Sequence, residues 1–116
     1  MTIAPYDLSY PMTPGRCLRI YITESDRIDG KPALEAIISL CQKAGLHGVS
    51  VVRCIEGMGR HGIHTTEFLA LANNLPLMVE IMDSSERIDH AIAILRPHLD
   101  GRLAVTWPVE LLRPAE

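Results

Sequence analysis

Residues 17–23 read Cys-Leu-Arg-Ile-Tyr-Ile-Thr, and the fold prediction starts from this stretch. Aliphatic and more polar residues alternate along it, with Leu18, Ile20 and Ile22 on one side and Arg19, Tyr21 and Thr23 on the other. A period of two residues is typical of a strand with one buried face. We therefore expect the first strand of a sheet at residues 17–23.

Two helices and three more strands are predicted outward from this strand. Pro32 fits a first helical turn and Gly45 a helix end, with apolar residues at helical spacing between them. Ser84 or Ser85 can cap a second helix, which Pro97 marks at its last turn. The apolar or β-branched runs predicted as strands are 49–55, 75–83 and 103–109.

The predicted order is β-α-β-β-α-β, which defines an α+β, ferredoxin-like fold. Two right-handed β-α-β halves give a four-stranded antiparallel sheet with both helices on one face. The predicted second and third strands carry aliphatic residues on both faces, so we expect the open face to be covered by oligomerisation. We expect one domain at residues 17–116, preceded by an irregular, proline-rich arm at residues 1–16.

The composition is that of an ordinary soluble globular protein and argues against nucleic-acid binding. The chain has 116 residues, a formal net charge of −3 and only 4% aromatic residues. Nucleic-acid partners are therefore disfavoured, because phosphate backbones require clustered positive charge. Cys17, Cys41 and Cys54 lie in apolar runs and are interpreted as core residues. With neither a secretory signal nor a membrane-spanning run, a cytoplasmic location is expected.

Two loops carry the residues of a candidate anion site. The first, Glu56–Gly62, holds three glycines and is predicted not to form a regular element; Gly57 and Gly59 can expose backbone N–H groups beside Arg60, His61 and His64. The second is Asp100-Gly101-Arg102, predicted to lie between the second helix and the last strand. An arginine in each loop favours a phosphate site, which neighbouring subunits could complete. The charged residues Glu24, Asp26 and Arg27 are interpreted as a solvated turn.

Three segments, in order, resemble PII signal proteins. Cys54–Thr65, CIEGMGRHGIHT, resembles the family pattern VKGFGRQKGHT; Leu75–Ile81 resembles LPKVKIEI; and Asp100–Val105, DGRLAV, resembles GDGKIFV. The runs LRIYITESDR, IEGMG and IHT look closer still to a PII-like family of unknown function that is often found beside transporters. The likeness covers residues 17–107.

This resemblance implies a homotrimer with ligand sites between its subunits. Gly57, Gly59 and Arg60 would bind phosphate or order the loop, and Arg102 would replace a phosphate-contacting lysine. His61 takes the place of a glutamine that helps to bind magnesium and 2-oxoglutarate. The implied ligand is AMP, ADP or ATP, with or without Mg, and the implied partner is a transporter or an enzyme.

The sequence departs from the PII pattern in three places. Leu77 and Met78 stand where the PII pattern has the lysine that pairs with 2-oxoglutarate, so this effector is not expected. The loop between Thr65 and Leu75 is short and has no tyrosine to modify. Arg113 is the remaining basic residue near the C-terminus, which favours AMP or ADP over ATP.

Two alternatives to a non-enzymatic regulator stay open. A small hydrolase could use water near His61 or His64 to attack a bound phosphate ester or nucleotide. A metal-handling trimer of related fold could use these two histidines together with Glu56. Neither paired carboxylates nor a Ser-His-Asp spacing supports catalysis, and no catalytic or metal-ligating residue is assigned.

Overall fold

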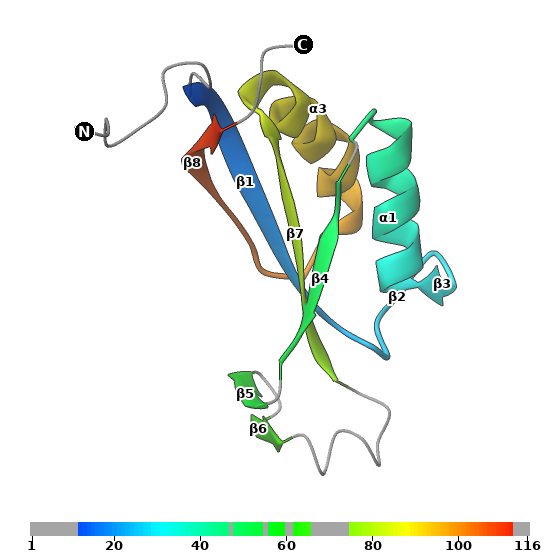
Figure 1. Ribbon diagram of the computed structural model, residues 1–116. Helices are drawn as coiled ribbons and strands as arrows, with labels where there is room; N and C mark the ends of the chain where they lie inside the picture. The colour runs from blue at the N-terminus through cyan, green and yellow to red at the C-terminus, as the bar shows by residue number, and fades with distance from the viewer. Residues whose placement is uncertain (1–11, 47, 55, 60–61, 66–74, 113–116) are drawn as a thin grey trace, which may run out of the picture.

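The computed structural model describes residues 12–46, 48–54 and 75–112, and the backbone alone of 56–59 and 62–65. Its main sheet has the strand order β4-β7-β1-β8, and every neighbouring pair is antiparallel. These strands are β1 (Met12–Thr23), β4 (Ser50–Arg53), β7 (Pro76–Ser84) and β8 (Ala104–Leu112). Two helices cover one face of this sheet (Figure 1), α1 (Ala33–Lys43) and α3 (Ser85–Leu95), with the 3-10 turn η1 (Arg96–His98) after the second. The predicted ferredoxin-like α+β fold is confirmed.

The first strand is longer than predicted. β1 begins at Met12, so residues 12–16 pair with β7 and β8 and are not part of an irregular arm. The prolines that suggested an arm do not prevent this: Pro14 pairs with Glu110 within the strand. The rest of the predicted arm, residues 1–11, lies outside the described residues.

Gly15 is enclosed where β1 passes between its two neighbours. A Cβ atom at this position would lie 2.7 Å from the carbonyl oxygen of Asp83 and 2.8 Å from Leu111. The backbone carbonyl cannot rotate away as a side chain can, so only glycine fits without a shift of β7.

Gly15→Ala should lower the free energy of unfolding by about 2 kcal/mol, within the usual cost of overpacking. Gly48→Ala is the matched control, because an added Cβ there meets nothing within 4 Å. Urea denaturation followed by circular dichroism measures both variants. Equal stability of the two would show that β1 and β7 are not held this closely in solution.

The predicted signals hold at the start of α3 and at the end of α1, whereas Pro32 precedes α1 and is not in its first turn. The Ser84 hydroxyl accepts a hydrogen bond from the Arg87 N–H at 3.3 Å, which confirms the serine cap. At the other helix, Gly45 has a φ of 79° and follows the last turn of α1. The N–H of Leu46 then reaches back to the Cys41 carbonyl at 3.1 Å, closing the helix end.

The core lies between the sheet and the two helices and is aliphatic. Fully buried members come from both layers: Ile20, Ile37, Val79, Ile81, Ile88 and Leu95. Cys17 and Cys41 are also fully buried, as predicted, whereas Cys54 is partly exposed. Burial raises the pKa of the Cys41 thiol to about 11, so this group stays protonated at neutral pH.

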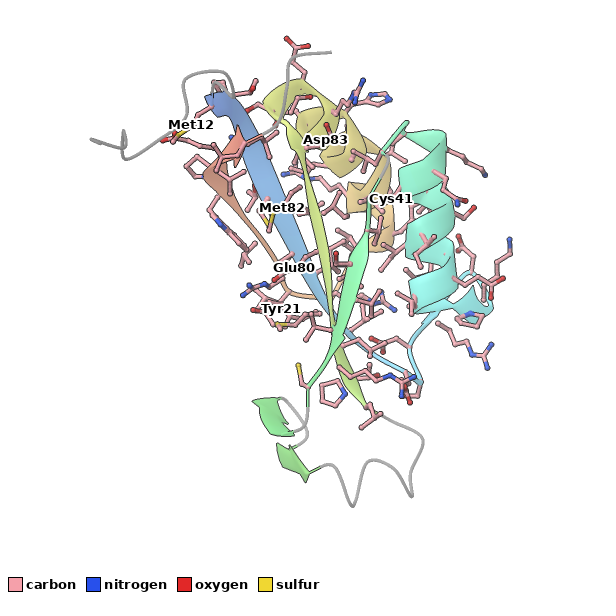
Figure 2. The ribbon with its side chains drawn as sticks, viewed as in Figure 1. Met12, Tyr21, Cys41, Glu80, Met82 and Asp83 are labelled. Atoms are coloured by element: carbon pink, nitrogen blue, oxygen red, sulfur yellow. The ribbon has the colours of Figure 1, made fainter. Side chains whose placement is uncertain are left out.

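The face of the sheet away from the helices carries a polar centre within an apolar surface. Arg19 donates to Glu80 at 2.7 Å, and its guanidinium lies 4.9 Å from the centre of the Trp107 ring. Tyr21, Glu80 and Met82 lie on this face in Figure 2. Exposed apolar side chains lie on the same face around this polar centre, at Val52, Met82 and Val105. The aliphatic open face predicted from the sequence is therefore present.

Within the described residues, no helix has both the length and the apolar character needed to cross a membrane.

Candidate functional site

The glycine-rich segment forms paired strands, which corrects the prediction that it cannot be a regular element. β5 (Glu56–Gly59) and β6 (Gly62–Thr65) pair antiparallel, with Gly57 opposite His64 and Gly59 opposite Gly62. Three glycines lower the intrinsic strand propensity, but the pairing supplies the backbone hydrogen bonds. Arg60 and His61, between the two strands, lie outside the described residues, as does segment 66–74.

The second predicted loop, Asp100-Gly101-Arg102, is a tight turn between η1 and β8. Gly101 has a φ of 76°, a backbone conformation that favours glycine. The Arg102 side chain folds back over the turn, with its guanidinium 3.4 Å from the carbonyl oxygens of both His98 and Asp100. The Arg102 side chain therefore stabilises the turn in which it lies.

Arg102 also forms contacts between this turn and the segment that follows β1. Its guanidinium donates to the Arg27 carbonyl at 2.9 Å. Its Nε is buried, has no hydrogen-bond partner among the residues that the structure describes, and lies 3.8 Å from the Asp26 carboxylate. Nearby, His98 Nδ1 lies 3.6 Å from Asp29 Oδ2. These contacts join residues 26–29 to residues 98–102.

Segment 24–32 is ordered by internal contacts and is not simply the solvated turn that its charges suggested. It holds a small hairpin of β2 (Arg27–Ile28) and β3 (Lys31–Pro32), whose turn residues Asp29 and Gly30 both have positive φ, 51° and 80°. This geometry is that of a two-residue hairpin turn. At the start of the segment, Glu24 pairs with Arg53 of β4 at 3.2 Å.

The two candidate loops lie at the same end of the sheet but at opposite edges. Since neighbouring strands alternate in direction, the end of β4 and the start of β8 share one end of the sheet. Two strands separate these edges, so the loops leave the sheet about 14 Å apart, at the usual strand spacing. One subunit therefore does not bring the hairpin of β5 and β6, hereafter the hairpin, together with the Asp100–Arg102 turn at the sheet.

The described residues contain no group of three or more histidine, cysteine or acidic side chains that could hold a metal ion. The three residues of the metal-handling alternative lie in the hairpin, outside the described side chains: Glu56, His61 and His64. That alternative stays a prediction.

Most of the chain matches the model of a known protein family. A family model described as "Uncharacterized ACR" and called DUF190 matches residues 15–111. The chain belongs to the DUF190 family. Two curated DUF190 relatives carry the name UPF0166 protein: one from Aquifex aeolicus is 29% identical over 91 residues, covering 78% of this chain and 87% of the relative. One from Methanocaldococcus jannaschii is 28% identical, covering 70% of this chain and 75% of the relative.

Solved structures similar to this DUF190 chain are PII-like proteins. CPII from Thiomonas intermedia, bound to ADP, AMP and bicarbonate, matches with a TM-score of 0.70 at 16% identity, over 90% of this chain and 93% of that one. A putative PII-like signaling protein from Thermus thermophilus matches with a TM-score of 0.62 at 13% identity, over 87% and 92%. GlnK from B. subtilis, in complex with ATP, gives 0.53 at 11%, over 83% and 82%. The predicted resemblance to PII-like proteins is confirmed at the level of fold.

Proposed function

We propose that this DUF190 protein is a non-enzymatic regulator that binds an adenine nucleotide or another small anion in clefts between its subunits. The observation that carries the proposal is the placement of the hairpin and the Asp100–Arg102 turn, at one end of the sheet and on opposite edges. A second copy, approaching one edge, would bring its own hairpin to this turn. The site would then form only in the oligomer.

The ligand class is proposed from the residues and from the similar structures. CPII was solved with ADP, AMP and bicarbonate, and GlnK with ATP. In this chain the ligand-binding set would be the hairpin residues and the turn residues, namely Gly57, Gly59, Arg60, His61, His64, Asp100, Gly101 and Arg102. Arg102 would meet a phosphate only by leaving its carbonyl partners, so Arg60 is the better candidate for a direct contact.

A 2-oxoglutarate site is not proposed. Leu77, one of the residues at the lysine position of the PII pattern, is 3% exposed and packs in the core. Met78 is the other, and it lies opposite Val52 on the open face. Neither side chain supplies the cation that a dicarboxylate requires.

The proposed assembly is a homotrimer that buries the open face of the sheet. Met82 is 50% and Val52 43% exposed on this face, and burying such apolar surface favours association. The helices would face outward, and the hairpin would be presented to a partner such as a membrane transporter or an enzyme. Ligand binding would change the conformation of the β5–β6 hairpin, and that change would be the signal. The proposed location is the cytoplasm.

Calorimetric titration with AMP, ADP, ATP and cyclic AMP, each with and without magnesium, tests this proposal. We expect one nucleotide per subunit and a loss of at least tenfold in affinity for Arg60→Ala. Lys43→Ala, which removes an exposed cation at the end of α1, is the control and should stay within twofold. An absence of heat with every nucleotide at millimolar concentration would overturn the nucleotide site. Phosphate release above a heat-killed sample would instead support the hydrolase alternative.

A further inference from the structure

A cavity of 610 Å³ lies between β8 and the helical layer, beside the Asp100–Arg102 turn. Its volume is within the range of small-molecule sites. All three residues of the turn line it, so in the proposed nucleotide site this cavity is the part that one subunit supplies. The hairpin of a second copy would approach it from outside. The side chains in the cavity therefore bear on which ligand the site takes.

The two arginines that line the cavity differ in what their guanidinium groups contact. The Arg102 guanidinium donates to the Arg27 carbonyl at 2.9 Å, and the carbonyl oxygens of His98 and Asp100 lie 3.4 Å away. The exposed Arg96 side chain forms neither a hydrogen bond nor an ion pair with any residue in the described part of the chain. Arg102 can meet an anion only by giving up its carbonyl partners, whereas Arg96 gives up none.

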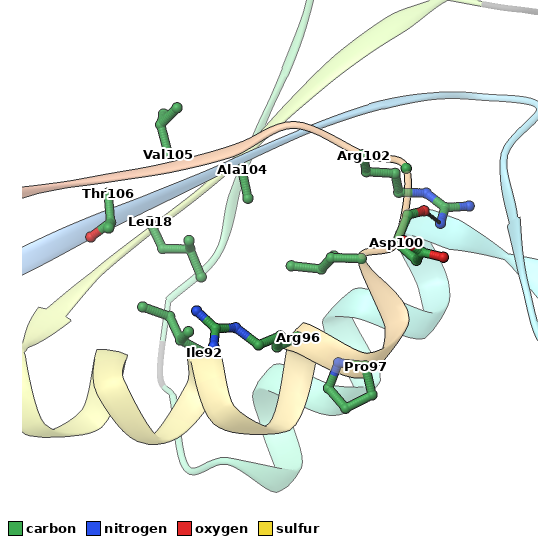
Figure 3. A pocket seen from close by; sticks show the side chains of 11 residues that line it. Leu18, Ile92, Arg96, Pro97, Asp100, Arg102, Ala104, Val105 and Thr106 are labelled. Carbon is green, nitrogen blue, oxygen red and sulfur yellow. Dashed lines mark hydrogen bonds between the residues drawn. The ribbon is translucent and has the colours of Figure 1, made fainter.

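The charged groups of the cavity lie at different ends. Figure 3 shows the Arg96 side chain extending along the cavity toward Ile92, and the Asp100 side chain at the turn, away from the Arg96 guanidinium. An anion is attracted by the guanidinium and repelled by the exposed carboxylate of Asp100. The negative group of a ligand therefore belongs at the Ile92 end of the cavity.

The floor of the cavity is apolar. It is formed by Leu18, Ile92, Leu99 and Ala104, of which Leu18 is 3% exposed and the other three are partly buried. A bare anion such as phosphate or bicarbonate would leave this surface in contact with water. A ligand that joins an anionic group to a flat or apolar body would cover it, and burying apolar surface adds to affinity.

We propose that Arg96 holds the phosphate of a nucleoside monophosphate in this cavity, with the nucleoside against Leu18 and Leu99. This inference rests on the proposed function and narrows its ligand class. One free guanidinium can form a bidentate pair with one phosphate group. Among the described residues that line the cavity, no second cation is free for the further phosphates of ATP, and a longer phosphate chain would approach Asp100.

NMR titration of the whole protein with AMP, adenosine, inorganic phosphate and ATP tests the proposal, because it also measures weak affinities. AMP should bind more tightly than ATP, and about tenfold more tightly than adenosine or phosphate. Arg96→Gln should weaken AMP binding about tenfold but change adenosine binding by less than about twofold, because adenosine lacks the group that Arg96 contacts. Lys43→Gln removes an exposed cation at the end of α1 and is the matched control, with both affinities unchanged.

Three results would overturn this proposal and leave the proposed function standing. The first is equal AMP binding by Arg96→Gln and the unchanged protein. The second is an equal loss for AMP and adenosine, which would mean that Arg96 shapes the cavity and does not contact the phosphate. The third is tighter binding of ATP or of inorganic phosphate than of AMP. If neither AMP nor ATP bound, the proposed nucleotide site would fail, and this proposal with it.

Discussion

Replacing Arg102 with alanine should lower the free energy of unfolding by about 3 kcal/mol, even without a ligand. The guanidinium is mostly buried and bonds to the Arg27 carbonyl, with two more carbonyls within reach. Hydrogen bonds that involve a charged group contribute about 1.5–3 kcal/mol each, and the variant leaves these carbonyls without that donor. Urea denaturation gives the change. Hydrogen exchange should also quicken at residues 26–31.

Arg96→Ala is the matched control for this measurement. It removes an arginine six residues away that has no bonded side-chain partner among the described residues, so stability should change by about 0.5 kcal/mol or less. If Arg102→Ala were as stable as this control, the carbonyl contacts would contribute nothing. The arginine would then be better explained as a ligand contact alone.

Glu80→Ala should convert the proposed trimer to monomers. Its carboxylate is the partner of Arg19 at the centre of the open face, with an exposed side-chain fraction of 18% in the single subunit. Once the face is covered, an unpaired arginine is a buried charge, and removing one partner of a buried pair costs about 3–5 kcal/mol. Sedimentation velocity at micromolar concentration measures the loss of assembly.

Two companion variants make this result specific. Glu86→Ala removes an exposed carboxylate in the first turn of α3 and should leave the mass unchanged. The double variant Arg19→Met with Glu80→Met should recover assembly, because two apolar side chains of similar size replace the pair. A Glu80→Ala protein that keeps its full mass would show that the subunits do not meet through this face.

The order of the elements could be predicted because each is marked locally. Alternation marks β1, an apolar run marks β7, the serine cap starts α3, and Gly45 ends α1. The start of β1 could not be predicted in the same way. Pro14 and Gly15 disfavour a strand locally, and only pairing with strands far along the chain overrides that preference.

The two loops of the candidate site could be predicted from the sequence, but the contacts that their side chains make could not. Sequence patterns marked the glycines and Arg102, yet nothing in them indicated that Arg102 would bind the carbonyl of Arg27, 75 residues away. Contacts between charged groups and distant backbone carbonyls leave no periodic signal. The ion pair of Glu24 with Arg53 was not predicted either, because pairing between side chains far apart in the sequence leaves no local pattern, and Glu24 was interpreted as part of a solvated turn.

The two edges of the main sheet limit how far this protein can polymerise. Exposed edges let identical chains add to one another without end, which is how fibres grow. Here β4 is only four residues long and ends with the charged Arg53, and β8, although continuous, contains Pro108, which has no backbone N–H to donate. Continuous edge-to-edge stacking would break at the proline in each copy. Each copy therefore offers a neighbour only a short run of unpaired edge groups, which limits edge-to-edge growth.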